Sequence, residues 1–87
     1  MSLSDQRSAA LHSIEAIIRE AVANPDLVVR EETNARDVNG WDSLTHVSII
    51  LAIEKAFIVK LTSAEVARLE TVGALLEIVL ARGKAVA

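Results

Sequence analysis

Apolar residues recur every three or four positions in the first quarter of the chain, which is the spacing of one face of an α-helix. This pattern predicts a helix over about residues 4–23. Its buried stripe consists of Leu11, Ile14, Ile18 and Val22. The charged positions between them are expected to face water: Arg7, Glu15, Arg19 and Glu20. Proline disfavours helical geometry in the residue before it, so Asn24-Pro25-Asp26 is predicted to end this helix.

Residues 24–42 follow neither a helical nor a strand period. Connections in compact domains are mostly about 4–6 residues long, and much longer ones are usually functional or disordered. The segment contains four apolar residues that we expect to lie across the core: Leu27, Val28, Val29 and Val38. Its acidic residues are expected to form a solvated face: Glu31, Glu32 and Asp37. Because this long segment ends in Gly40-Trp41-Asp42-Ser43, it is the first indication of a functional site.

A second helix is predicted over about residues 43–56. At 100° per residue, one side of this helix is predicted to be buried, with His46, Ile49 and Glu54 on its edges. The residues on that side are Val47, Ile50, Ile53 and Phe57. The opposite, outward side carries Leu44, Thr45, Ser48, Leu51, Ala52 and Lys55. Two outward leucines near Ser43 make this side a candidate docking surface for a partner.

Polar residues mark the starts of two further helices. Thr62 and Glu65 have the spacing of a capping box, so a short helix is expected to begin there and to end near Leu69. Thr71 can cap a last helix that ends at Gly83. Its buried stripe is predicted to be Val72, Leu75, Leu76, Val79 and Leu80. The predicted fold is therefore all-α: a small bundle of three main helices and one short helix, with a long loop between the first two.

The composition narrows the class of protein. Eighty-seven residues are enough for one domain, 1–87, and too few for two independent cores. Without cysteine there can be no disulfide, thiolate metal site or thiol nucleophile. A net charge of −3 argues against nucleic-acid binding. No stretch reads as a signal peptide or a membrane span, so we expect a cytoplasmic protein, which we take to be a monomer.

Three residues near the start of the second helix are of the types found in a hydrolytic triad: Asp42, Ser43 and His46. A triad needs an acid on the far nitrogen of the histidine and oxyanion donors beside the serine. Here the acid adjoins the serine in sequence, and no glycine-rich stretch offers donors. We therefore expect no catalytic residues, and no histidine–carboxylate spacing indicates a metal site. His46 is interpreted as a partly buried or surface residue, and Trp41 as an anchor for the end of the loop.

Ser43 has two interpretations. In the first, Asp42 or Ser43 only caps the free amides at the helix start. In the second, the hydroxyl is exposed at a helix start, where the helix dipole tolerates an attached phosphate. Such a serine is well placed to carry a phosphodiester.

The stretch "TNARDVNGWDSL", residues 33–44, resembles the long loop and the Asp-Ser-Leu signature of acyl carrier proteins. The resemblance continues through "LAIEKAF" at 51–57 and "TVGALLEIV" at 71–79. It implies a small four-helix bundle whose serine receives a 4′-phosphopantetheine arm from coenzyme A. Ser43 would then be the attachment site, Asp42 would help present it to the transferase, and Leu44 would begin the docking face. The arm's thiol holds acyl or aminoacyl groups as thioesters, so a chain without cysteine could carry out thiol chemistry.

Three departures from the family pattern favour a specialised stand-alone member. The outward face of the second helix is neutral, apolar or basic, whereas that helix is strongly acidic in fatty-acid carriers. Ile58 follows Phe57 where relatives often have glycine or a polar turn residue. The glycine-rich serine motif of peptidyl carriers is replaced by Trp41-Asp42.

We interpret the chain as a non-catalytic carrier that shuttles acyl or aminoacyl intermediates between enzymes of fatty-acid, polyketide or related biosynthesis. The implied partners are a phosphopantetheinyl transferase, a loading enzyme, and downstream transferases or synthases. The predicted docking residues are Leu44, Thr45, Ser48, Leu51, Ala52 and Lys55. The alternative is a non-catalytic helical adaptor, in which Ser43 only caps and the outward leucines bind a partner helix.

Overall fold

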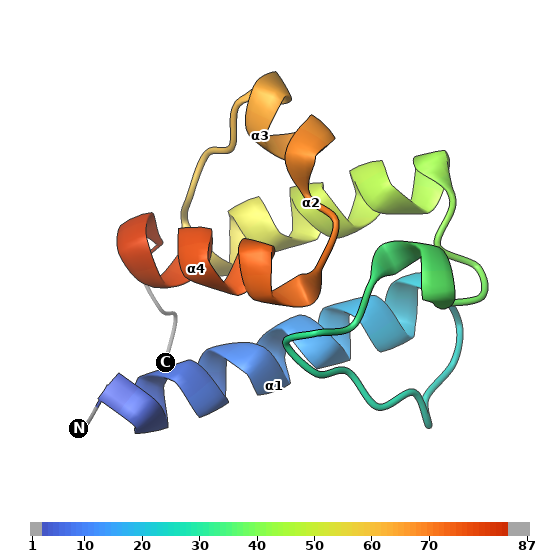
Figure 1. Cartoon of the computed structure of the whole chain (residues 1–87), viewed down its shortest axis with the longest axis horizontal. Coiled ribbons are helices and arrows are strands. Elements are labelled where there is room, and N and C mark those ends of the chain that lie inside the picture. Colours follow the sequence, from blue (N-terminus) through green and yellow to red (C-terminus); the bar gives the residue numbers. More distant parts are fainter. Residues whose placement is uncertain (1–2, 84–87) are drawn as a thin grey trace.

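The computed structural model describes residues 3–83, and within them the chain forms four α-helices and one short 3-10 helix. These are α1 (Leu3–Ala21), η1 (Ala35–Asp37), α2 (Ser43–Phe57), α3 (Ser63–Arg68) and α4 (Val72–Arg82). α2 and α4 both pack against α1, and α3 lies on the far side of them (Figure 1). The predicted all-α bundle is confirmed. The ends of the predicted 1–87 domain, residues 1–2 and 84–87, lie outside the described part.

The predicted helix ends are correct to within two residues. α1 stops at Ala21 rather than residue 23, because Ala23 already has a positive φ of 56°. The capping box of α3 is confirmed: the Thr62 hydroxyl accepts from the Glu65 amide, and the Glu65 carboxylate accepts from the Thr62 amide. Thr71 caps α4 by accepting from the Ala74 amide.

Ile58 ends α2 in the left-handed region, with φ 52° and ψ 56°. Its amide donates to the Glu54 carbonyl oxygen, a bond of the kind that glycine usually makes after a helix. An L-residue there costs roughly 1–2 kcal/mol relative to right-handed geometry. The side chain is 63% exposed, whereas the next residue, Val59, is buried. The departure from the family pattern at this position therefore lies at a strained turn.

The core is one cluster of aliphatic side chains and Phe57, contributed by all the long helices and by the loop. One prediction for α2 is wrong: Val47 is 53% exposed, whereas Ile49, which was placed at the edge of the inner side, is completely buried. α2 is apolar almost all round, so its pattern does not determine which side faces α1. In α1, Ile14 and Ile18 are fully buried, while the predicted core residues Leu11 and Val22 lie at the margin.

The long loop between α1 and α2 is fastened to the start of α4 by backbone hydrogen bonds. The Val72 amide donates to the Thr33 carbonyl oxygen at 2.9 Å, and the Gly73 amide donates to the Glu31 carbonyl oxygen at 2.7 Å. The first amides of a helix have no partner within the helix, so the loop satisfies two of them. An antiparallel bridge between Asn34 and Thr71 continues the contact.

Side chains of α1 hold the same loop from the other side. The Arg7 guanidinium binds the Glu31 carboxylate through two nitrogens, one of them at 2.8 Å, and also binds Glu77 of α4 at 2.7 Å. Arg7 and Glu31 keep 35% and 39% of their side-chain surface exposed, so both still face water in part, but the sequence did not predict that they pair. These partners are 24 and 70 residues away from Arg7, so no local pattern could reveal them.

The base of the loop is held in a similar way. Arg19 Nε donates to the Leu27 carbonyl oxygen at 2.6 Å, and Glu15 accepts from the Val29 amide at 2.8 Å. Arg19 and Glu15 also form an ion pair along α1. Val29 and Val38 of the loop are buried as predicted, but Val28 is 62% exposed.

We expect Gly73→Ala to destabilise the fold. A Cβ at this position would lie 2.9 Å from the Glu31 carbonyl oxygen, too close for the loop to stay bonded. Glycine to alanine inside a helix normally stabilises by about 0.5–1 kcal/mol. Here we expect a loss of roughly 1–2 kcal/mol in the free energy of unfolding, as for overpacking. Chemical denaturation measures it, and a more stable variant would contradict the described loop contact.

Candidate functional site

At the start of α2, the side chain that caps the helix and the serine hydroxyl belong to two different residues. Asp42 is the N-cap, and its Oδ1 accepts from the Thr45 amide at 2.8 Å. Ser43 is the first helical residue and is exposed. Among the residues that the structure describes, none hydrogen-bonds to the Ser43 hydroxyl. Of the two predicted capping residues, Asp42 therefore does the capping, and Ser43 is free for chemistry.

The Asp42 carboxylate is held in its charged form. The amide of Thr45 is the main cause, because a hydrogen bond to the carboxylate lowers the pKa of Asp42 below its ordinary value. The turn before it needs Gly40, whose φ of 88° is left-handed; a Cβ there would lie 3.4 Å from the Cβ of Val22, just after α1.

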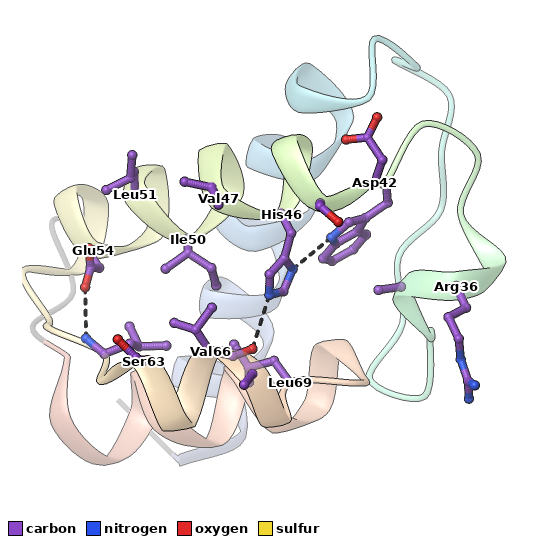
Figure 2. A pocket seen from close by; sticks show the side chains of 15 residues that line it. Arg36, Asp42, His46, Val47, Ile50, Leu51, Glu54, Ser63, Val66 and Leu69 are labelled. Carbon is purple, nitrogen blue, oxygen red and sulfur yellow. Dashed lines mark hydrogen bonds between the residues drawn. The ribbon is translucent and has the colours of Figure 1, made fainter.

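A groove of about 590 Å³ lies between α2 and α3 (Figure 2), and Ser43 is one of its lining residues. Most of its lining is apolar: Trp41, Val47, Ile50, Leu51, Leu61, Val66, Ala67 and Leu69. Asp42, Ser43 and His46 lie at one end. Glu54 and Ser63 lie together at the other end, as the close view shows. The serine therefore opens onto an apolar channel.

Polar bonds cross from α2 toward α3 near both ends of this groove. The His46 Nε2 atom lies 3.3 Å from the Val66 carbonyl oxygen. At the other end, Glu54 Oε2 accepts from the Leu61 amide at 2.9 Å (Figure 2). The two bonds join α2 to α3 and to the segment just before α3.

His46 was given no special role by the sequence, yet it joins three segments. Trp41 Nε1 donates to His46 Nδ1 at 3.0 Å, and the two ring centroids are 6.1 Å apart. Trp41 is half-buried and packs against the core, as expected for an anchor of the loop's end. In the sequence, the available signal for this contact was that Trp41 and His46 lie five residues apart on either side of the start of α2.

The residues of the hypothetical triad are brought close but are not joined as a triad. Both ring nitrogens of His46 lie within hydrogen-bonding distance of Trp41 and Val66, and Asp42 accepts from Thr45. Neither side chain is bonded to Ser43. Across residues 3–83, the carboxylates and histidines come together nowhere in a group of three or more able to hold a metal ion.

The predicted docking residues lie on the outside of α2 as a group. Leu44 is 80% exposed, Leu51 is 59% exposed, and Ser48 and Lys55 are also exposed. Thr45 and Ala52 are half-buried. The exposed Val47, which the periodicity had placed in the core, adds a third apolar residue to this side. In the part of the chain that the structure covers, no helix combines the length and apolarity needed to cross a membrane.

Comparisons with known proteins agree with this site. A family model described as the phosphopantetheine attachment site matches residues 12–79. An acyl carrier protein of Thermosynechococcus vestitus is 34% identical over 74 residues, which are 84% of this chain and 90% of the relative. The solution NMR structure of a holo acyl carrier protein from Geobacter metallireducens superposes with a TM-score of 0.77 at 30% identity, covering 84% of each chain.

These matches define a phosphopantetheine-bearing carrier, and the chain belongs to the acyl carrier protein family. It carries acyl groups on a covalently attached phosphopantetheine. The family consists of non-catalytic carriers that work with transferases and synthases. The resemblance noted in the sequence is confirmed, and the carrier is favoured over the helical adaptor.

We expect acid to remove the contribution of Asp42 to stability. Its pKa is lower in the folded chain than in the unfolded chain, so protons bind the unfolded chain more readily. The contribution is complete above the ordinary aspartate value of about 3.9 and is lost as pH falls through the lower, folded value. Asp42→Asn should therefore melt below the wild type at neutral pH, with a gap that narrows below about pH 4.

Thermal melts from pH 7 to pH 3 measure this gap. Asp37→Asn is the matched control, since Asp37 is an exposed acid at the end of η1 and is not the cap of a helix. A gap for Asp42→Asn that stays constant with pH would contradict a charge-assisted cap.

Proposed function

We propose that Ser43 receives the 4′-phosphopantetheine arm and that Asp42 presents it to a phosphopantetheinyl transferase. The observation that carries the proposal is the exposed Ser43 hydroxyl, which no described residue binds and which opens onto the groove between α2 and α3. Ser43 also lies within the region matched by the attachment-site family. The other serines of that region lie away from this end: Ser13 in α1, Ser48 in the middle of α2 and Ser63 at the far end of the groove.

The surroundings of Ser43 fit such an arm. The hydroxyl is at a helix N-terminus, where the partial positive charge of the helix dipole favours a phosphate. When bound, the group supplies a thiol that forms thioesters with acyl groups. The chain's own residues supply the attachment oxygen and, beside it, an apolar groove that would shelter an apolar cargo from water.

The shape and lining of the groove support an acyl cargo over an aminoacyl one. Its volume of about 590 Å³ falls in the range of small-molecule sites, roughly 300–1,000 Å³. Apolar side chains dominate its length, and charged ones stand only toward its ends. We place the chain in fatty-acid, polyketide or related biosynthesis. There it would act as one carrier domain over 1–87 and as a cytoplasmic monomer, in the compartment that supplies coenzyme A.

We expect Ser43→Ala to abolish labelling. Incubation with coenzyme A and a broad-range phosphopantetheinyl transferase should add one phosphopantetheinyl group to the wild type and none to the variant. Because Asp42 remains as the cap, the free energy of unfolding should change by no more than about 0.5 kcal/mol. Intact mass spectrometry measures the labelling, and denaturation checks the fold. Ser63→Ala is the control and should label fully; a label mapped to Ser13, Ser48 or Ser63 would overturn the assignment.

The outward side of α2 is the proposed docking surface for the transferase, the loading enzyme and downstream synthases. It consists of Leu44, Thr45, Ser48, Leu51, Ala52 and Lys55, to which the exposed Val47 is added. Apolar burial contributes about 25 cal/mol per Å² of area removed from water. Dissolved salt screens the attraction between exposed charges but does not weaken apolar burial. Docking through this surface should therefore depend little on ionic strength.

We expect Leu51→Asp to weaken binding to the cognate loading enzyme by at least tenfold, which is about 1.4 kcal/mol. The control is Val28→Asp, which introduces the same charge at a position of similar exposure, 62% against 59%, on the loop. Calorimetric titration measures both at two salt concentrations. Equal affinities for the two variants, together with steep salt dependence of the wild type, would show that charged residues dominate docking instead.

A further inference from the structure

The turn at the end of α2 carries a side chain that the fold does not use. Ile58 is left-handed, with φ 52°, and its side chain is exposed. The amides of Ile58 and Val59 both donate to the Glu54 carbonyl oxygen, the second at 3.1 Å. A helix end of this kind favours glycine at the first of these positions and an apolar residue at the second, which here is the buried Val59. Glycine in place of Ile58 would make the same bonds without the strain.

Ile58 extends a seam of exposed apolar residues along α2. Leu44, Leu51 and Ile58 repeat every seven residues, and Val47 lies three residues after the first. All four side chains are more than half exposed. Apolar residues with this spacing form the line along which one helix packs against another. At 1.5 Å per residue the seam is about 21 Å long, and a standard interface of about 800 Å² per partner is roughly 28 Å across, so one partner can contact all of it.

The free charges beside the far half of this seam are positive. Lys55 follows Leu51 by four residues, a flanking position where ion pairs between packed helices form. Lys60, two residues after Ile58, is also exposed, and no described residue forms an ion pair with either lysine. Glu54 is the only acidic residue of α2, and its carboxylate points toward α3, where it accepts a backbone amide (Figure 2). A matching partner therefore presents apolar residues with carboxylates beside them.

An enzyme that acts on the end of the arm can cover this part of α2. Ile58 lies fifteen residues after Ser43, which is about 22 Å along the helix. The arm has about fourteen bonds between the serine oxygen and the sulfur, so it spans roughly 17 Å at the length per bond of an extended peptide. A loading enzyme reacts with the thiol at the end of this arm. It can therefore sit along the whole seam while its reaction centre stays clear of Ser43.

We propose that Ile58 and Lys55 bind a helix of the loading enzyme, and that this helix has an apolar face flanked by carboxylates. Ile58 packs between the apolar side chains of that helix, and Lys55, with Lys60 near it, pairs with the carboxylates. Exposed ion pairs add little affinity, but they reject a partner that has basic residues at the same place. The proposal rests on the docking surface proposed for α2, whose apolar contacts supply most of the affinity.

Two synthetic, dye-labelled peptides are the probes. Both form amphipathic helices with leucines on one face; one has glutamates beside the leucines, and the other has lysines there. The unmodified chain should bind the glutamate peptide at least tenfold more tightly than the lysine peptide, as measured by fluorescence anisotropy. The amide NMR signals of Leu51, Lys55 and Ile58 should shift on binding. Added salt should narrow the preference, because it screens the charges.

Substitutions of Ile58 separate its side chain from the strain of its backbone. Ile58→Gly should weaken binding of the glutamate peptide at least fivefold and raise the melting temperature by about 4 °C or more, because the strain is relieved. Ile58→Ala should lose the same binding without this gain in stability, because alanine is still strained in the left-handed region. Ile58→Leu should retain binding. A side chain that served the fold alone would not give a more stable variant that binds more weakly.

Two further variants test the charge and the position. Lys55→Gln should reduce the preference for the glutamate peptide and leave the melting temperature unchanged, because no described residue pairs with the ammonium group. Val28→Ala is the matched control for Ile58→Ala, since Val28 is an exposed β-branched residue on the loop, at 62% against 63%. It should bind both peptides like the wild type.

Equal binding of the two peptides by the wild type would overturn the proposal. So would an Ile58→Gly variant that binds the glutamate peptide as tightly as the wild type, or one that is less stable. If Leu51→Asp still weakens binding in that case, the docking surface of α2 stands and only its extension to Ile58 fails. The peptides bind the unmodified chain, so a failure of attachment at Ser43 would appear in the labelling experiment alone.

Discussion

The carrier site depends on the first amides of α4, which have no hydrogen-bond partner within their own helix. A helix leaves its first N–H groups without internal partners, and here the carbonyl oxygens of Glu31 and Thr33 accept from two of them. Gly73 permits this contact, since its missing side chain leaves room for the loop backbone. A loop of this length would otherwise cover many conformations. Because these bonds hold the loop at its middle, the short segment that follows places Asp42 and Ser43 in one position.

The distribution of apolar residues over α2 and α3 accounts for the groove between them. α2 is apolar nearly all round, so one side can bury Ile49 and Ile53 in the core while another leaves Val47 and Leu51 at the groove. α3 contributes no fully buried residue: its Val66 packs against the edge of the core, and two polar bonds join α2 to α3 and to the segment just before it. The groove beside Ser43 thus lies next to a six-residue helix whose side chains are at most partly buried.

The sequence by itself determined the local features. The helix starts at Asp42, Thr62 and Thr71 depend on side chains that bond the amide three residues onward, so their signal is contained in a few neighbouring residues. The three long helices followed from apolar spacing, the short third helix from its capping box, and the candidate serine from its place at a helix start. The resemblance to acyl carrier proteins added the arm, which no periodicity could supply.

Only the tertiary structure decided what depends on residues far apart. The rotation of α2, which buries Ile49 and exposes Val47, follows from its packing on α1, because an apolar helix has no preferred inner side of its own. Arg7 meets Glu31 and Glu77 only because the loop folds back across α1 and α4. His46 meets Trp41 and Val66 for the same reason. Spacing along a chain encodes contacts within one helix, and contacts between elements appear only when the chain has folded.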